Sequence, residues 1–299
     1  MQALWMLLAA FFFSTMAVCV KVASAWFGAS ELVFWRGLIG MLFMWLLARS
    51  RGISLKTQYP GMHAWRSLVG VLSLGAWFYA IAGLPLATAM TLNYMSSVWI
   101  AAFLVGGALL AWNPRHGAAA ALHQGPLVLT VLAGFAGVVL MLRPTIEQNQ
   151  MFAGVVGLLS GMTAAFAYMQ VMALGKLGEP EMRTVFYFAL GSAVAGAVGM
   201  GIEGMAPWNW SHALWLLPVG LLASLGQLCM TRAYSHGATL VVANWQYSGI
   251  VFGAIYSVVL FGDSIALPGW IGMALICASG IAATVLRARA APNAPAEEH

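Results

Sequence analysis

Residues 90–99 read Met-Thr-Leu-Asn-Tyr-Met-Ser-Ser-Val-Trp and lie inside a stretch, residues 67–114, that contains no charged side chain. An asparagine, a tyrosine and two serines are unusual in so apolar a setting, because an unpaired amide or hydroxyl in hydrocarbon costs roughly 1–3 kcal/mol. A related phrase, Val-Val-Ala-Asn-Trp-Gln-Tyr-Ser-Gly, follows at residues 241–249. The two phrases lie in different halves of the chain and predict a fold built from two related units.

The composition indicates that a bilayer, and not water, surrounds most of the chain. Hydrophobic residues make up 62% of the 299 residues, charged residues make up 7%, and the mean hydropathy is +0.87. A soluble domain has a charged fraction of roughly 25%. Many uncharged runs have about 20 residues, the length that crosses hydrocarbon as one helix. The longest run must fold back at Gly83-Leu84-Pro85, because proline cannot continue a helix. Ten membrane-spanning helices are predicted near residues 4–23, 32–48, 64–82, 87–111, 126–142, 153–174, 182–201, 213–233, 239–261 and 268–286.

The positive charges predict how the chain is oriented. With both termini in the cytoplasm, ten of the thirteen Lys and Arg residues fall in cytoplasmic segments, and only Lys21, Arg36 and Arg143 fall on the outer side. The net charge of +5 is then a signal of orientation, and a nucleic-acid partner has little support. We expect a multi-pass protein of a bacterial-type inner membrane, with a disordered tail that begins near residue 290.

Comparison of the sequence with itself supports the two-unit fold. A shift of 151 residues pairs the Ser-Leu-Gly of residues 73–75 with that of residues 224–226, and it pairs Asn93 with Asn244. Residues 1–149 and 150–299 are therefore predicted to form two five-helix repeats. Because five is odd, the second repeat enters the membrane from the opposite side. Such inverted repeats are typical of proteins whose two halves rock around a site near the bilayer midplane.

Two segments resemble a known family. Residues 237–263, from Gly-Ala-Thr to Phe-Gly-Asp, together with Gly272 and Gly280, are similar to the closing part of an EamA-type repeat of the drug/metabolite transporter superfamily. Residues 30–36, Ser-Glu-Leu-Val-Phe-Trp-Arg, resemble the start of the second helix of that repeat. The resemblance covers about residues 4–286. It implies an all-α fold in which helices one to four and six to nine surround a central cavity, with helices five and ten behind them, and it implies export of small organic metabolites.

Polar and aromatic side chains near the middle of the spans are candidates to line that cavity. Asn93 and Ser97 are four residues apart on the fourth span, as Asn244 and Ser248 are on the ninth, so each pair shares one helix face. Aromatic walls with a few amides suit a flat, largely apolar solute with a small polar head. The alternative is that the paired residues only hold helices together, at about 0.6 kcal/mol per contact. The other candidates are Tyr79, Tyr94, Trp99, Tyr168, Gln227, Trp245 and Tyr247.

Two basic residues, Lys21 and Arg36, lie at the predicted outer ends of their spans. Their charges can snorkel to the interface or pair with Glu31, and the alternative is that they attract a substrate carboxylate. No Asp or Glu falls in the middle of a predicted span, and the six histidines fall in loops or near span ends. Proton-coupled carriers usually use an ionisable group at membrane depth. We therefore expect facilitated diffusion or exchange over proton antiport.

The sequence favours an exporter of small organic metabolites that works by alternating access, with aromatic or other apolar amino acids as the preferred cargo. Lipophilic drugs, purines and other metabolites are alternatives, and so is a receptor or structural protein of the membrane. An enzyme is not expected, because His-Glu-x-x-His, Gly-x-Ser-x-Gly and an intramembrane Asp pair are absent from the sequence. The three cysteines show no paired spacing, so neither a metal nor a cofactor is expected. The substrate, the net direction, the energy coupling, the resting conformation and the oligomeric state stay open, with a monomer as one option.

Overall fold

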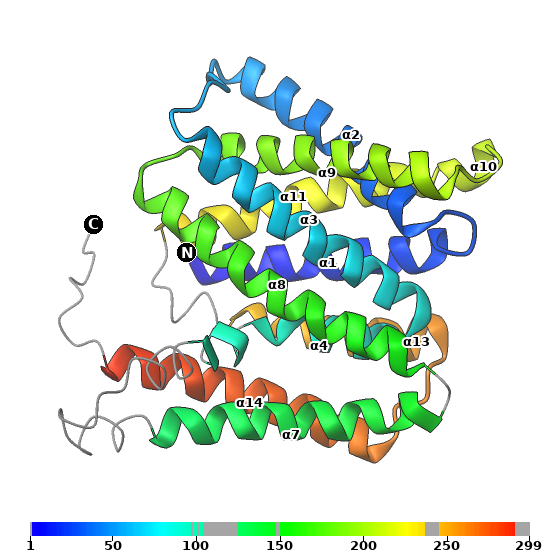
Figure 1. Cartoon of the computed structure of the whole chain (residues 1–299), viewed down its shortest axis with the longest axis vertical. Helices are drawn as coiled ribbons and strands as arrows, with labels where there is room; N and C mark the ends of the chain where they lie inside the picture. Colours follow the sequence, from blue (N-terminus) through cyan, green and yellow to red (C-terminus); the bar gives the residue numbers. More distant parts are fainter. Residues whose placement is uncertain are drawn as a thin grey trace.

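The computed structural model describes residues 2–96, 98–100, 102–103, 125–147, 150–236 and 245–290. Within these ranges every regular element is a helix, and the long helices run side by side (Figure 1). The described helices are α1 Gln2–Ala23, α2 Ala29–Ser50, α3 Pro60–Gly83, α4 Leu86–Tyr94, α7 Gly125–Glu147, α8 Met151–Lys176, α9 Glu181–Glu203, α10 Trp210–Ala213, α11 Leu216–His236, α13 Ser248–Phe261 and α14 Leu267–Ala290.

The length and composition of these helices fit a polytopic membrane protein. Six helical stretches are long and apolar enough to cross a membrane: α1, α2, α3, α8, α9 and the stretch from α10 through α11. Shorter apolar helices lie within α7, α13 and α14. The structure has helical residues at each predicted position, although residues 97, 101 and 104–111 of the fourth span and 239–244 of the ninth lie outside the described residues. The predicted break is confirmed, because α3 ends at Gly83 and α4 begins at Leu86.

The helices pack in pairs. The main pairs are α2 with α9, α3 with α8, α1 with α11, α4 with α13, and α7 with α14. In Figure 1, α7 and α14 lie together at one edge of the bundle, while α2 and α9 lie toward the opposite edge. The backbones of α2 and α9 lie close together: a Cβ added at Gly37 would lie 2.7 Å from the Ala189 carbonyl oxygen and 2.8 Å from the Ser192 carbonyl carbon. The two backbones therefore touch, as small residues allow in membrane bundles.

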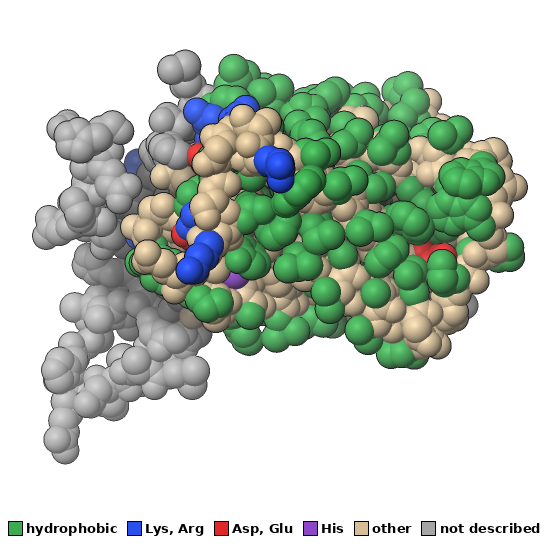
Figure 2. Space-filling view, turned by 90° about the horizontal axis from the view of Figure 1, so that it is seen from above, with side chains coloured by type: hydrophobic (Ala, Val, Ile, Leu, Met, Phe, Trp, Pro, Cys, Tyr) green, Lys and Arg blue, Asp and Glu red, His purple; other side chains and the backbone are tan. Residues whose placement is uncertain are grey.

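The surface of the bundle is apolar along its flank and basic at one end. Figure 2 shows hydrophobic side chains over most of the visible flank, with Lys and Arg gathered at one end. Leu42, Leu72 and Val198 are each more than half exposed. A flank of this kind would be an aggregation liability in water and is stable against lipid tails. We call the other feature the basic end; it carries Arg49 in the last turn of α2 and Lys176 in the last turn of α8.

Candidate functional site: a buried cavity with two arginines

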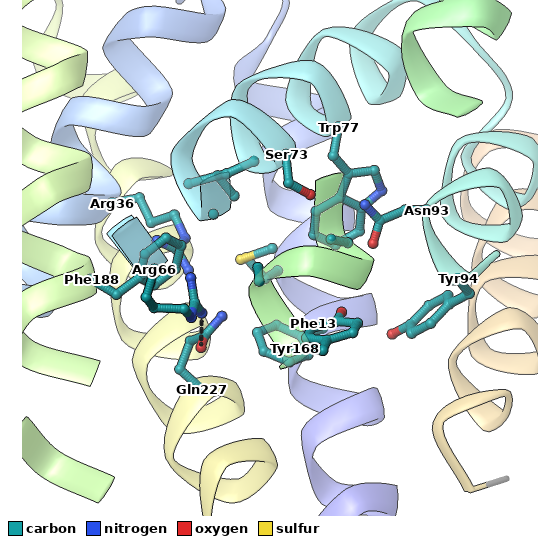
Figure 3. Close-up of a pocket in the computed structure, with 15 residues that line it drawn as sticks. Phe13, Arg36, Arg66, Ser73, Trp77, Asn93, Tyr94, Tyr168, Phe188 and Gln227 are labelled. Atoms are coloured by element: carbon teal, nitrogen blue, oxygen red, sulfur yellow. Dashed lines mark hydrogen bonds between the residues drawn. The ribbon is translucent and has the colours of Figure 1, made fainter. Parts of the chain in front are cut away.

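A buried cavity lies where α1, α2, α3, α4, α8, α9 and α11 meet (Figure 3). Its room for water-sized molecules is about 50 Å³. Helices from the first and the second half of the chain both contribute to its wall. The lining residues are Phe13, Met16, Arg36, Arg66, Gly70, Ser73, Leu74, Trp77, Asn93, Tyr94, Ala164, Ala167, Tyr168, Phe188 and Gln227.

Helix α3 supplies the longest strip of this wall. Arg66, Gly70, Ser73 and Trp77 follow one another three or four residues apart, so they share one face of the helix. Glycine at position 70 leaves room for a neighbour, because a Cβ added there would overlap the Arg66 guanidinium and lie 2.8 Å from the Phe188 ring. The helix therefore presents a cation at one end of the strip and an aromatic wall at the other.

Two arginines in the cavity have little hydrogen bonding. Arg36 and Arg66 are 4% and 2% exposed, and their Cζ atoms lie 4.9 Å and 4.1 Å from the centre of the Phe188 ring. Arg66 Nη2 donates to Gln227 Oε1 at 3.4 Å, and Arg36 Nη1 donates to Ser192 Oγ at 3.5 Å. Within the described ranges, Arg36 Nε, Arg66 Nε and Arg66 Nη1 have no acceptor, and no carboxylate forms an ion pair with either guanidinium. Both charges face the cavity without a counter-charge.

Asn93 both lines the cavity and joins helices. Its Nδ2 donates to Ser160 Oγ of α8 at 3.1 Å, and Ser160 Oγ in turn donates to the Gly157 carbonyl at 2.6 Å. Ser73 of α3 donates to the Ser160 carbonyl at 2.8 Å. This network ties α3, α4 and α8 together beside the cavity. The two interpretations of Asn93, helix joint and cavity wall, therefore apply to one side chain at once.

The two tyrosines of the wall are backed by a second polar chain. Tyr168 stacks on Tyr234 of α11, with ring centres 6.0 Å apart. Tyr234 Oη donates to Gln246 Oε1 at 2.8 Å, and Gln246 Nε2 donates to Ser96 Oγ at 3.4 Å. Tyr94 is 4% exposed and faces the same cavity. The aromatic wall is thus held from behind by hydrogen bonds between the two halves of the chain.

The structure brings together some of the residues that the sequence singled out. Asn93, Tyr94, Tyr168, Gln227 and Arg36 all line the cavity. Arg36 lies deeper than expected, because α2 begins at Ala29 and places this residue about two turns inside the helix. Glu31 does not pair with it: the Glu31 carboxylate accepts hydrogen bonds from the backbone N–H groups of Gly28 and Ala206.

Other predicted lining residues from the first half lie outside this cavity. Tyr79 is 46% exposed and packs edge-on against Phe152, in a separate groove lined by α2, α3, α8 and α9. Trp99 turns toward α7, where its ring meets Phe135 at 5.0 Å and 88°. Lys21 donates to the carbonyl oxygens of Ala82 and Leu84, at the connection between α3 and α4. Its charge therefore caps a loop and does not face the cavity.

The predicted residues of the ninth span also lie elsewhere. Trp245 is 45% exposed, and Ser248 Oγ donates to the Trp245 carbonyl at 2.7 Å. Tyr247 is buried against α14, because a Cβ added at Gly280 would overlap the Tyr247 hydroxyl. Ser97 and Asn244 lie outside the described residues. The second copy of the polar phrase therefore contributes none of its described predicted residues to this cavity.

Sequence reasoning missed two features of the cavity, Arg66 and Phe188. Arg66 was counted with the cytoplasmic charges because it lies only two residues after the predicted start of the third span, near residue 64. The helix begins earlier, with Pro60 in its first turn. Arg66 consequently lies inside α3 and not at its start. Proline at the first helical position is a known start signal, and it could have revealed the depth of Arg66. No pattern marked Phe188, which is one of many apolar residues on α9.

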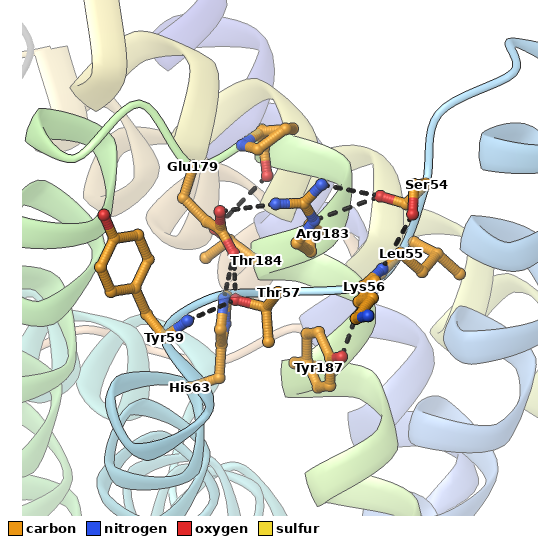
Figure 4. Close-up of polar contacts among 11 residues, drawn as sticks. Ser54, Leu55, Lys56, Thr57, Tyr59, His63, Glu179, Arg183, Thr184 and Tyr187 are labelled. Atoms are coloured by element: carbon orange, nitrogen blue, oxygen red, sulfur yellow. Dashed lines mark hydrogen bonds and ion pairs between the residues drawn. The ribbon is translucent and has the colours of Figure 1, made fainter.

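A polar cluster at the basic end ties two loops together (Figure 4). Thr57 Oγ1, His63 Nε2 and Arg183 Nη1 all donate to the carboxylate of Glu179, the last two at 2.8 Å and 2.7 Å. Arg183 also donates to the Ser54 carbonyl at 2.9 Å. We call this set, Ser54, Thr57, His63, Glu179 and Arg183, the loop clamp. It joins the α2–α3 connection to the α8–α9 connection.

Comparisons with known proteins place the chain among transporters. It is 33% identical to the pseudopaline exporter CntI of Pseudomonas aeruginosa over 90% of this chain and 92% of that one. It is 28% identical to an uncharacterized transporter of Helicobacter pylori (92% and 91% covered) and 26% identical to a riboflavin transporter of Rhizobium johnstonii (93% and 89% covered).

The other two comparisons concern families and folds. No protein-family model matches the chain. A protein of known crystal structure shares the fold, with a TM-score of 0.65 and 20% identity over 97% of this chain and 98% of that one. The relationship to CntI covers nearly the full length of both chains, at an identity that indicates common descent. The chain belongs to the family of membrane transporters that includes the pseudopaline exporter of P. aeruginosa.

Proposed function

We propose that this transporter exports a small, ring-bearing organic metabolite by alternating access, without proton coupling. The observation that carries the proposal is the buried cavity, whose aromatic walls come from helices of both halves of the chain. The aromatic side chains Trp77, Tyr94, Tyr168 and Phe188 line this cavity, and aromatic walls suit a flat solute. Two relatives with a named cargo, pseudopaline and riboflavin, also move small organic molecules.

The helix packing supports two inverted repeats, residues 1–149 and 150–299. In chain order, the counterparts of α1, α2, α3, α4 and α7 are α8, α9, α11, α13 and α14. When each helix is exchanged with its counterpart, the pair α3–α8 becomes α11–α1, and the pair α2–α11 becomes α9–α3. All four of these pairs are present, and the remaining main pairs, α2–α9, α4–α13 and α7–α14, map onto themselves. This symmetry is what a pseudo-twofold axis in the membrane plane would produce. It supports ten spans of the drug/metabolite transporter type, while the distribution of Lys and Arg supports an inner-membrane protein with both termini in the cytoplasm.

The cargo is a wider class than the aromatic and apolar amino acids that the sequence suggested. The aromatic wall fits their rings, but the described lining residues include no acid to bind an ammonium group. A lipophilic cation is disfavoured, because it would meet the positive charges of Arg36 and Arg66. We therefore propose ring-bearing metabolites, aromatic amino acids among them, as the cargo. A receptor or structural role is the alternative if no solute moves.

Flux through purified protein in liposomes tests the proposal. The solutes are labelled tryptophan, phenylalanine, alanine and a lipophilic cation, each measured with and without an imposed pH gradient. We expect saturable flux of tryptophan and phenylalanine above that of protein-free liposomes, slower flux of alanine, and no acceleration by the gradient. Absence of flux for every solute would favour the receptor or structural role, and a strong acceleration by the gradient would contradict uncoupled transport.

Asn93 allows the two interpretations of the polar phrase to be separated. We expect Asn93→Ala to lower flux of the transported solute at least about tenfold, as loss of a binding contact worth 1.4 kcal/mol would. Its melting temperature should change little, because one interhelical hydrogen bond in a membrane contributes about 0.6 kcal/mol. The matched control is Ser67→Ala, which removes a 3.1 Å bond from α3 to the Tyr187 carbonyl away from the cavity. Equal flux in both variants would make Asn93 a helix joint only.

A further inference from the structure

The cavity holds two cations that lie against one ring (Figure 3). The guanidinium groups of Arg36 and Arg66 come from the neighbouring helices α2 and α3, and their Cζ atoms lie 4.9 Å and 4.1 Å from the centre of the Phe188 ring. Like charges repel more strongly in a low-dielectric interior than in water. The closeness of the two arginines therefore needs a compensating interaction.

The neighbouring residues supply only part of that interaction. The Phe188 ring attracts both cations, by an amount on the order of 1–2 kcal/mol for each desolvated contact. Gln227 and Ser192 each accept one long hydrogen bond. A guanidinium carries five N–H donors, and in the part of the chain that the structure describes Arg36 Nε, Arg66 Nε and Arg66 Nη1 have no acceptor. Three buried donors of these two cavity-lining arginines are thus left without a partner.

The acids of the chain are not placed to neutralise the two arginines. Glu179 pairs with His63 and Arg183 at the basic end. Glu31 is occupied by two backbone N–H groups. The sequence contains no Asp or Glu at residues 32–146, 148–178, 182–202 or 204–262. Because an uncompensated buried charge costs several kcal/mol, a bound anion would supply a counter-charge that neither Glu179 nor Glu31 gives.

We propose that Arg36 and Arg66 together bind an oxyanion group of the cargo, a carboxylate or a phosphate ester, while Trp77 and Tyr168 contact the ring attached to it. This inference rests on the proposed function, and it narrows the ring-bearing cargo to ring-bearing anions. The planar fork of a guanidinium matches both oxyanions in bidentate geometry. One end of the cavity is thus cationic and the remainder is aromatic, and the expected substrate has the complementary shape and charge.

Ligand-induced stabilisation of the purified full-length protein in detergent tests the charge preference. The probes are 3-phenylpropionate, phenyl phosphate and 3-phenylpropionamide, and the amide keeps the ring and chain of the first acid without its charge. We expect at least one acid to raise the melting temperature and the amide to have no effect. A response to only one acid identifies the oxyanion. No response to either acid, or an equal response to the amide, overturns the proposal.

Variants assign the effect to the two arginines. Arg36→Gln and Arg66→Gln should each weaken binding of the acid on the order of 30-fold, the equivalent of losing a buried charged contact of about 2 kcal/mol. The melting temperature of the ligand-free protein should stay the same or rise, because one of two repelling charges is gone. Arg66→Lys, which keeps the charge and loses the fork, should bind with intermediate affinity.

The matched control is Arg49→Gln, which removes an exposed guanidinium that lies over Trp45 on the same helix as Arg36. It should leave binding of the acid unchanged. A Gln variant of Arg36 or Arg66 that binds the acid as tightly as the unmodified protein overturns the proposal. A fall of several degrees in the ligand-free melting temperature also overturns it, since that is the behaviour of a structural cation.

Binding and flux distinguish this inference from the proposed function. Flux of a ring-bearing solute, with equal binding of the acid and the amide, removes the anion site and leaves the transport proposal intact. Acid-selective binding that Arg66→Gln abolishes, without flux of any solute in liposomes, supports the anion site and contradicts the transport cycle.

Discussion

A Gly37→Leu variant is expected to yield no folded, monodisperse protein in detergent, as measured by size-exclusion chromatography. Gly37 lies where α2 crosses α9, and a Cβ there would overlap the Ala193 backbone nitrogen and lie 2.7 Å from the Ala189 carbonyl oxygen. Backbone atoms of a packed helix cannot swing aside as a side chain can. Even one added carbon would force the helices apart, and overpacking of this kind costs about 1–3 kcal/mol or more.

The matched control is Gly75→Ala in α3, where an added Cβ meets nothing within 4 Å. This variant should be as stable as the unmodified protein or slightly more stable, because alanine favours a helix over glycine by about 0.8–1.0 kcal/mol. Gly37→Ala provides the graded case and should lower the melting temperature where Gly75→Ala does not. Equal behaviour of Gly37→Ala and Gly75→Ala would mean that the α2–α9 crossing is looser than its geometry indicates. The crossing matters for the site because Arg36 precedes Gly37 directly.

The positions of the helices could be predicted because charges and prolines interrupt otherwise apolar runs. Gly83-Leu84-Pro85 is the clearest case, since α3 ends and α4 begins there. Glycine spacing carries similar information. Gly157 and Gly161 are four residues apart on α8, a spacing that permits close helix contact, and a Cβ added at either would crowd Leu92 of α4.

The face that each residue presents could not be predicted, for a physical reason. In a soluble helix the polar stripe reports the outward face, but lipid is as apolar as a protein core, so a membrane helix lacks that signal. Tyr79 and Trp77 are two residues apart on α3, yet Trp77 lines the cavity and Tyr79 is 46% exposed in another groove. The sequence analysis chose Tyr79 and not Trp77, because spacing alone does not tell which of the two faces the cavity.

Repetition of a phrase did not predict repetition of a role. Residues 90–99 supply Asn93 and Tyr94 to the cavity, while Trp245 of the matching phrase is 45% exposed.

The depth of the two cavity arginines was misjudged for a different reason. Helices α2 and α3 begin three or four residues earlier than predicted. Because each residue adds about 1.5 Å along a helix, Arg36 and Arg66 lie in the cavity and not at the ends of their spans.

The second large effect is expected for Glu179→Gln, which should lower the melting temperature at pH 7 clearly more than a surface substitution does. The Glu179 carboxylate holds the loop clamp together by accepting from Thr57, His63 and Arg183. His63 and Glu179 are 2% and 7% exposed, so water compensates poorly for the lost charge. Removing one partner of a buried, hydrogen-bonded charge costs about 3 kcal/mol. The control is Glu203→Gln, an exposed carboxylate at the end of α9, which should change the melting temperature little.

The effect of Glu179→Gln is expected to depend on pH in one direction. Burial by itself raises the pKa of the Glu179 carboxyl, but the hydrogen bonds from Thr57, His63 and Arg183 and the charge of Arg183 outweigh it and leave the pKa below its ordinary value of 4.5. The unfolded chain therefore takes up a proton at a higher pH than the folded protein does. It follows that the carboxylate stabilises the fold fully above its ordinary pKa and loses this contribution as the pH falls toward the lowered value.

Melting curves of both proteins from pH 7 down to about pH 3 measure this dependence. The difference between the unmodified protein and Glu179→Gln should be constant near neutrality and shrink as the pH falls below 4.5. A difference that stays constant across the whole range would mean that the carboxylate charge does not hold the clamp. Because the clamp joins residues 54–63 of one predicted repeat to residues 179–183 of the other, a confirmed pH dependence would also show that the two halves are tied at the basic end by charge and not by apolar contact alone.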